Sequence, residues 1–94
     1  MKEQDYSLQE LLKAFADQKH LRDKYLNKKL EITWKSLYPA MAQFSSRFQY
    51  KNGILTVWIS SSALKHELNF TKAKMLGQIN EALGEALVSQ LEFR

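Results

Sequence analysis

The first half of the chain carries two stretches in which hydrophobic residues recur at helical spacing. The first follows a capping box formed by Ser7 and Glu10, and its apolar positions are Leu8, Leu11, Leu12 and Phe15. Lys19 and Arg22 occupy positions where this stripe should continue, so we expect a break between them. The pattern therefore predicts two successive helices.

The second stretch is an amphipathic helix with a narrow apolar seam. Its members are Leu26, Leu30, Trp34, Leu37, Met41 and Phe44, which step by three or four residues. Pro39 interrupts it, and because proline cannot donate to the carbonyl four residues back, we expect a kink or restart near Tyr38. Trp34 lies on the seam and is predicted to anchor the core.

A β-hairpin follows, turning at Asn52 and Gly53, two residues that tolerate the positive φ of a type I′ turn. A two-residue turn fixes the register, from Lys51 opposite Ile54 through Arg47 opposite Trp58 to Ser46 opposite Ile59. Because side chains alternate along a strand, the inward set is Phe48, Tyr50, Leu55, Val57 and Ile59. The outward set is Arg47, Gln49, Lys51, Ile54, Thr56 and Trp58.

The last third of the chain predicts one long helix and a final strand. Serines 60–62 are N-cap candidates, Gly84 is a C-cap, and Asn69 or Gly77 could bend the helix between them. Its apolar stripe is Leu64, Leu68, Met75, Leu76, Ile79 and Leu83. After Gly84, we expect a strand with Leu87, Leu91 and Phe93 inward, Ser89 as the polar residue of that set, and Val88, Gln90, Glu92 and Arg94 outward.

These elements predict an α+β fold in the order α-α-β-β-α-β. A length of 94 residues suits one domain over residues 1–94. A strand followed by a helical crossover and another strand favours parallel pairing. We therefore expect a small three-stranded sheet, made of the β-hairpin and the C-terminal strand, covered by helices on one side.

Composition and charge exclude some classes of site and favour some classes of partner. The chain has no cysteine, which excludes disulfides and thiolate metal sites. Its net charge of +4, with more lysine than arginine, leans toward a polyanion partner, although a solvated surface explains the same charge. No apolar run suits a signal peptide or a membrane span, so a cytoplasmic protein is expected.

Catalytic and metal-binding motifs are incomplete. Ser62 and Lys65 match the S-x-x-K string of serine acyl enzymes, but the partner motifs of that class are missing. His20 and His66 are far apart, and no glycine-rich phosphate loop is present. We therefore expect no enzyme activity, no cofactor and no metal site.

Surface residues carry the remaining signal. On the second helix Lys24, Lys28 and Lys35 share a polar face, with Lys29 nearby, and this face either meets phosphates or is simply solvated. On the sheet, Arg47 opposite Trp58 predicts a cation–π pair. With Lys51 and Arg94, this outward tryptophan resembles a stacking platform for single-stranded bases. The alternative is that another helix or a second protein chain covers Trp58 and Ile54.

Taken in order, several short strings resemble the DciA family over about residues 8–94. They are Trp34 to Leu37, Met41-Ala42, Asn52 to Val57, Ser61 to Leu68, Lys72, Ile79-Asn80, Leu83-Gly84 and Phe93-Arg94. The resemblance implies a bacterial DNA-replication protein that recruits or loads the DnaB-type replicative helicase without hydrolysing ATP itself. It also implies a KH-like domain and a functional importance of Trp34.

The chain departs from the family pattern at Pro39, where glycine is frequent, and at Leu64, where many members have a second aromatic residue. It also lacks the G-x-x-G loop by which KH domains clamp a nucleic-acid backbone. Longer relatives carry an additional disordered segment that this chain lacks.

The leading hypothesis is a helicase-recruiting module that holds single- or double-stranded DNA weakly and without sequence preference. The lysines expected to hold phosphates are Lys24, Lys28, Lys29, Lys35, Lys65 and Lys72. The alternatives are a general single-stranded nucleic-acid-binding domain that uses Trp58, Arg47 and Lys51, and a homodimer that buries its sheet face. No membrane partner is expected.

Overall fold

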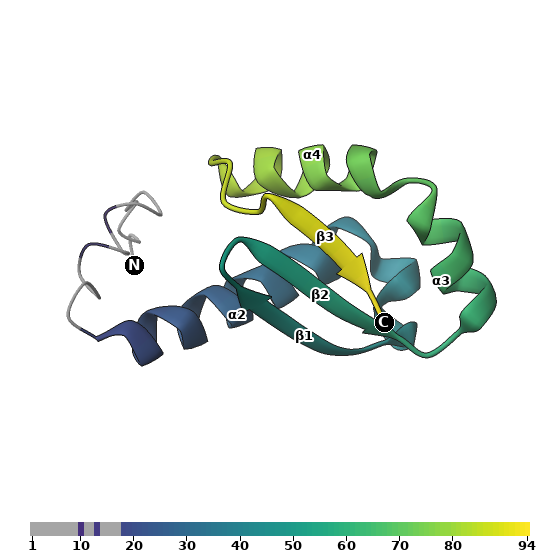
Figure 1. Ribbon diagram of the computed structural model, residues 1–94, viewed down its shortest axis with the longest axis horizontal. Coiled ribbons are helices and arrows are strands. Elements are labelled where there is room, and N and C mark those ends of the chain that lie inside the picture. The colour runs from purple at the N-terminus through teal and green to yellow at the C-terminus, as the bar shows by residue number, and fades with distance from the viewer. Residues whose placement is uncertain (1–9, 11–12, 14–17) are drawn as a thin grey trace, which may run out of the picture.

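The computed structural model describes residues 10, 13 and 18–94. Figure 1 shows the element order: α2 (Lys19–Leu37), the short 3₁₀ helix η1 (Pro39–Phe44), β1 (Ser45–Lys51), β2 (Ile54–Ile59), α3 (Ser62–Asn69), α4 (Lys72–Leu83) and β3 (Gln90–Phe93). The chain is α+β, as predicted. The predicted first helix lies almost wholly outside the described residues; of its positions, Glu10 and Lys13 are helical.

The second predicted helix begins and ends close to where the sequence places it. Gln18 has non-helical backbone angles, so the break comes one residue before the expected interval, and residues 19–22 form the first turn of α2. At the other end the amide of Tyr38 donates to the carbonyl of Trp34, and η1 restarts the chain at Pro39. The predicted restart at the proline is confirmed.

The hairpin turns at Asn52 and Gly53, with φ of 53° and 81°. The predicted register is confirmed from Lys51 opposite Ile54 to Arg47 opposite Trp58. The prediction for Ser46 is wrong: an irregularity between Ser45 and Arg47 places Ser45 opposite Ile59. The extra residue of this bulge brings the Ser45 hydroxyl to the buried indole of Trp34, which donates to it at 3.0 Å.

The third strand pairs with β2 in parallel, and the sheet order is β1-β2-β3. This strand is shorter than expected, and the residues before it have the opposite exposure to the one predicted: Val88 is buried and Ser89 is exposed. The cause is the side chain of Asn80, which accepts from the Val88 amide at 2.9 Å and donates to the Val88 carbonyl at 2.8 Å. The chain there is held against α4 and does not pair as a strand.

The single long helix expected after the hairpin is two helices. The chain leaves α3 at Phe70 and Thr71, directly after Asn69, and α4 begins at Lys72. Ser61 caps α3 by accepting from the amide of Leu64 at 3.2 Å. Gly84 ends α4 with φ of 80°, in the left-handed conformation that a glycine C-cap adopts.

One face of the sheet carries the core. α2 lies behind the strands in Figure 1, and α4 runs alongside β3. The buried cluster comprises Leu30, Trp34, Leu55, Val57, Ile59, Leu68, Met75, Ile79, Val88 and Leu91. Leu37 and Phe44, expected in the seam, are instead more than one third exposed because they lie at the ends of α2 and η1. None of the described helices combines the length and hydrophobicity needed to span a membrane.

Candidate nucleic-acid and partner surfaces

The other face of the sheet, which we call the open face, forms a grid of three rows. Strand pairing sets two of the rows from β1 through β2 to β3, and the backbone bonds of Arg94, the residue after β3, set the other. The rows are Arg47, Trp58 and Arg94; Gln49, Thr56 and Glu92; and Lys51, Ile54 and Gln90. Period-2 alternation turns these side chains away from the core. Most of them are polar, and all except the buried Thr56 are exposed or half-buried.

The first row places one tryptophan between two arginines. The guanidinium carbon of Arg47 lies 4.6 Å from the ring centroid of Trp58, which confirms the predicted cation–π pair. On the other side, the Arg94 amide donates to the Val57 carbonyl at 3.0 Å, and the Arg94 carbonyl accepts from the Ile59 amide at 2.7 Å. This ladder aligns Arg94 with Trp58 in the parallel register.

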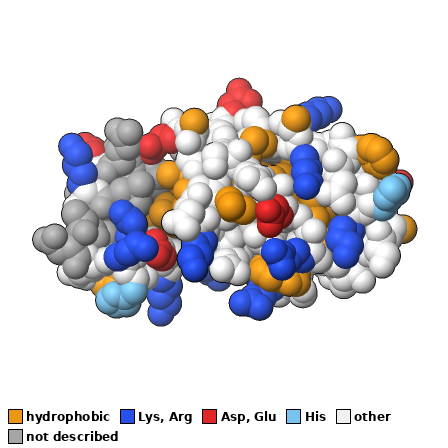
Figure 2. Space-filling model, viewed as in Figure 1, with side chains coloured by type: hydrophobic (Ala, Val, Ile, Leu, Met, Phe, Trp, Pro, Cys, Tyr) orange, Lys and Arg blue, Asp and Glu red, His pale blue; other side chains and the backbone are white. Residues whose placement is uncertain are grey.

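The open face is positively charged. Arg47, Lys51 and Arg94 oppose a single carboxylate, Glu92, which accepts from the amide of Gln90 at 2.8 Å and lies 3.9 Å from the Arg94 guanidinium. A shallow hollow of about 270 Å³ runs over these rows, from Lys51 and Asn52 past Trp58. Figure 2 is viewed from the side of the open face, since α2 lies behind the strands in Figure 1. It shows Lys and Arg side chains around hydrophobic groups.

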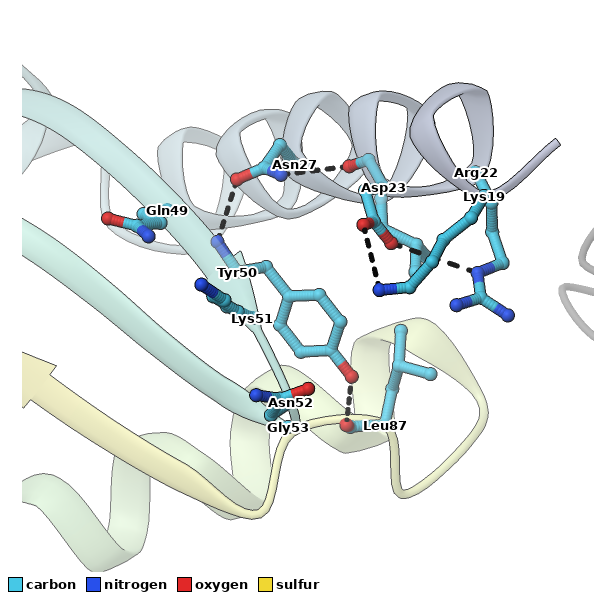
Figure 3. Close-up of a pocket in the computed structure, with 11 residues that line it drawn as sticks. Lys19, Arg22, Asp23, Asn27, Gln49, Tyr50, Lys51, Asn52, Gly53 and Leu87 are labelled. Carbon is cyan, nitrogen blue, oxygen red and sulfur yellow. Dashed lines mark hydrogen bonds and ion pairs between the residues drawn. The ribbon is translucent and has the colours of Figure 1, made fainter.

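A second hollow, of about 460 Å³, lies between the start of α2 and the hairpin turn (Figure 3). Some of its polar groups bond one another, while the Nε of Arg22 is buried without a hydrogen-bond partner and lies 3.8 Å from the Asp23 carboxylate. Asn27 accepts from the Tyr50 amide at 2.7 Å and donates to the carbonyl of Asp23 at 2.8 Å, while the Tyr50 hydroxyl donates to the Leu87 carbonyl at 2.7 Å. These bonds join α2 to the hairpin, and the hairpin to the segment before β3. We therefore interpret the hollow as a structural joint.

The predicted lysines of α2 lie on a different side of the molecule. Lys24, Lys28, Lys29 and Lys35 are exposed. Because Leu26, Leu30 and Trp34 turn toward the sheet, this lysine face points away from the open face. Lys35 also bonds Glu31 at 2.8 Å, and this hydrogen bond lowers the pKa of the Glu31 carboxyl against the opposing effect of burial. Lys35 is therefore the most neutralised of the four.

Lys65 and Lys72 lie on α3 and at the first position of α4, and both are half-buried. The first turn of α4 contains Lys72 and Lys74 and no acidic residue. Because the partial charge at a helix N-terminus is positive, lysines in this turn oppose stability. Lys72 and Lys74 therefore do not stabilise α4 through the helix dipole.

The exposed aromatic residue at the corner between α3 and α4 escaped the sequence analysis. Phe70 is 78% exposed, and its ring contacts His66 edge-on with centroids 5.1 Å apart. One signal could have revealed it: Phe70 falls between Leu68 and Met75 and out of phase with the stripe that continues through both. A large apolar side chain out of phase on a helix is a candidate contact residue.

Trp34 lies inside the core and belongs to neither surface. Its side chain is fully buried, and its ring packs against Tyr38, Phe48 and Phe93 with centroids 4.8, 6.3 and 5.9 Å away. Direct contact with a partner is not available to it in this fold. The structure therefore gives Trp34 a role in the packing of α2 on the sheet, and the functional importance expected of this position stays a prediction.

Residues 10, 13 and 18–94 contain no group of three or more His, Asp or Glu side chains placed to hold a metal ion. The surfaces described above offer cations, an aromatic ring and an exposed phenyl group. Such groups bind polyanions and proteins.

The family model described as "Dna[CI] antecedent, DciA" matches residues 7–93, which is nearly the whole chain. No curated protein and no solved structure matches the chain.

Proposed function

The chain belongs to the DciA family, which is involved in loading the replicative helicase, and we propose that it recruits or loads the DnaB-type helicase onto DNA without chemistry of its own. The observation that carries this proposal is the family match over residues 7–93. Recruitment requires one surface for the helicase and benefits from a second that holds DNA weakly. The fold offers candidates for both.

For DNA, we propose weak binding without sequence preference through the cations of the open face and of α2. Arg47, Lys51 and Arg94 lie on one side of the molecule, and the lysines of α2 lie on another. Contacts to phosphates from such groups carry no sequence information and weaken as salt rises. This mode of binding suits a protein that acts wherever a helicase is needed.

For the helicase, we propose Phe70 as the contact residue. Its ring is 78% exposed and is absent from the core cluster, so its exposure brings no gain in packing. Lys72 and Lys74 follow it at the start of α4. An aromatic side chain beside cations fits an apolar pocket with an acidic rim on a protein partner, and such anchors supply much of the binding energy at interfaces.

The test is capture of the same organism's replicative helicase by the immobilised chain, after nuclease treatment to remove bridging DNA. Phe70→Ser is expected to weaken capture about 30-fold or more. Ile32→Ser is the matched control, because Ile32 is 55% exposed on α2, away from the corner. Absence of capture by the unmodified chain would contradict the proposed function, and equal capture by Phe70→Ser would contradict the assignment of the surface.

A second candidate function is a general single-stranded nucleic-acid-binding domain without a helicase role. The row of Arg47, Trp58 and Arg94 favours it. Nucleic-acid binding in the absence of any helicase capture would support this alternative. Homodimerisation through the open face is a third, and concentration-dependent sedimentation with Trp58→Ala restoring the monomer would support it.

A further inference from the structure

The arginines on the strands to either side of Trp58 distinguish the first row of the open face from an ordinary solvated sheet. Arg47 lies over the indole at 4.6 Å, and the backbone ladder sets Arg94 beside it on the opposite strand. An indole offers a flat surface for stacking, and a guanidinium can both stack on it and donate to a phosphate. The row can therefore bind both parts of a nucleotide, the base by stacking and the phosphate by hydrogen bonds.

The charge on this face suits a polyanion better than a second protein chain. Three cations and one carboxylate share the nine positions of the grid. A second copy would bring the same excess of positive charge against this one, which opposes a symmetric dimer through the open face. The hollow that passes Trp58 continues to Lys51 and Asn52 at the hairpin turn, so a cation lies along it beyond the aromatic ring.

Base stacking on the indole requires an unpaired strand. In a duplex the faces of the bases are covered by their neighbours, whereas an unpaired strand can turn a base onto an aromatic side chain. Only an unpaired strand can use the indole.

We infer that the open face binds single-stranded nucleic acid, with a base stacked on Trp58 and phosphates on Arg47, Arg94 and Lys51. This inference rests on the proposed function, because it specifies the strand form and the site of the DNA contact that was proposed there. It differs from the KH mode of binding, since the G-x-x-G loop is absent.

The experiment measures the affinity of the full chain for a fluorescently labelled oligothymidylate and for a duplex of equal length, by anisotropy without helicase. Trp58→Ala is expected to weaken single-strand binding about 5- to 150-fold, and Trp58→Phe is expected to retain most of it. Duplex affinity should change little in either variant. Phe70→Ala is the matched control, because it removes an exposed aromatic ring from another surface.

Salt titration tests the phosphate contacts independently of Trp58. Arg47→Ala and Arg94→Ala should each lower the slope of log affinity against log salt by about 0.7, the value for one phosphate of a single strand. A thermal unfolding curve for each variant shows whether it remains folded at the temperature of the assay.

Five outcomes decide between the occupants. Loss of affinity in Trp58→Ala with recovery in Trp58→Phe supports the site. Unchanged affinity in Trp58→Ala overturns it, as does equal loss for the duplex. Loss of nuclease-treated helicase capture in Trp58→Ala, with single-strand affinity intact, assigns the face to a protein and overturns the inference. Failure of helicase capture by the unmodified chain contradicts the proposed function and leaves the strand-binding result to stand alone.

Discussion

The indole N–H of Trp34 donates to the hydroxyl oxygen of Ser45 at 3.0 Å, which joins the middle of α2 to the first residue of β1. The same hydroxyl donates to the carbonyl of Met41 at 2.9 Å. This chain of bonds satisfies the one polar atom of a fully buried indole. It also explains why β1 carries an irregularity at its start, since the regular register would face Ser46 toward Ile59 instead.

Ser45→Ala should destabilise the protein by about 1 to 3 kcal/mol, because it leaves the indole N–H buried without an acceptor. Ser45→Thr retains a hydroxyl and should cost less. Guanidinium unfolding followed by circular dichroism measures both. Equal stability of the Ser45→Ala variant and the unmodified chain would show that the Trp34 bond is not needed.

Trp34→Phe should weaken helicase capture and strand binding only in proportion to the fraction of protein that is unfolded. The reason is that the ring lies in the core and contacts Tyr38, Phe48 and Phe93. Capture measured at several temperatures, beside the unfolding curve, separates the two effects. A fully folded variant that has lost capture would place Trp34 in an interface.

Gly53→Ala should be destabilising for two separable reasons. Its φ of 81° costs an L-residue about 1 to 2 kcal/mol, and an added Cβ would lie 2.7 Å from the Ser89 hydroxyl oxygen. That hydroxyl donates to the Gly53 carbonyl at 3.1 Å, so it must rotate and lose a bond of about 0.5 to 1.5 kcal/mol.

A double-mutant cycle with Ser89→Ala isolates the second contribution. Gly53→Ala should cost less in the Ser89→Ala background, because no hydroxyl remains to be displaced. Strict additivity of the two changes in unfolding free energy would contradict the proposed clash.

The hairpin was the most predictable part of the fold. Asn52 and Gly53 determine the register by local chemistry, and the alternation of burial along Leu55, Val57 and Ile59 agrees with it, so two independent constraints select one pairing. The outward position of Trp58 followed from the same register. The first row of the candidate site was therefore accessible from the sequence.

Two of the errors share a physical cause, which is that side-chain bonds between different elements override local periodicity. Asn80 binds the backbone of Val88 and withdraws that residue from the strand, and Trp34 recruits Ser45 into the bulge. The partners are 8 and 11 residues apart and lie in different elements, so a pattern read within one element does not reveal them. No glycine or proline marks the break after Asn69, so the sequence did not predict it. The exposure of Phe70, which follows from that break, was not predicted either.

Lys72→Glu should raise the free energy of unfolding by about 0.3 to 1 kcal/mol, since it replaces a cation by an anion in the first turn of α4. The same change should weaken nucleic-acid binding if Lys72 meets phosphates. Lys72→Gln separates loss of positive charge from gain of negative charge. Thermal unfolding at low salt provides the measurement, and a lower melting temperature for Lys72→Glu would contradict the dipole argument.

Stability should fall in alkaline solution through Tyr50 and Tyr38. Burial raises the pKa of each phenol above the ordinary value of 10.0. The folded state then holds these protons to higher pH than the unfolded state does. The stabilisation is complete below about pH 10 and is lost as the pH rises through the folded pKa values.

Comparison with Tyr50→Phe tests this dependence. The hydroxyl of Tyr50 donates to the Leu87 carbonyl at 2.7 Å, so the variant should be less stable at neutral pH. The difference in unfolding free energy should narrow above pH 10, where the unmodified phenol ionises. Ser45→Ala is the control, because the bond it removes involves no titrating group and its loss of unfolding free energy should not depend on pH. If the loss for Tyr50→Phe is equally independent of pH, the assignment to the Tyr50 phenol is contradicted.

The most direct test of the account is the amount of replicative helicase that becomes bound to a DNA bubble when the chain is present, measured without any other loader. We expect the unmodified chain to increase this amount, Phe70→Ser to abolish the increase by losing the helicase, and Trp58→Ala to reduce it while nuclease-treated capture remains intact. An unmodified chain that leaves helicase occupancy of the bubble unchanged would contradict the account.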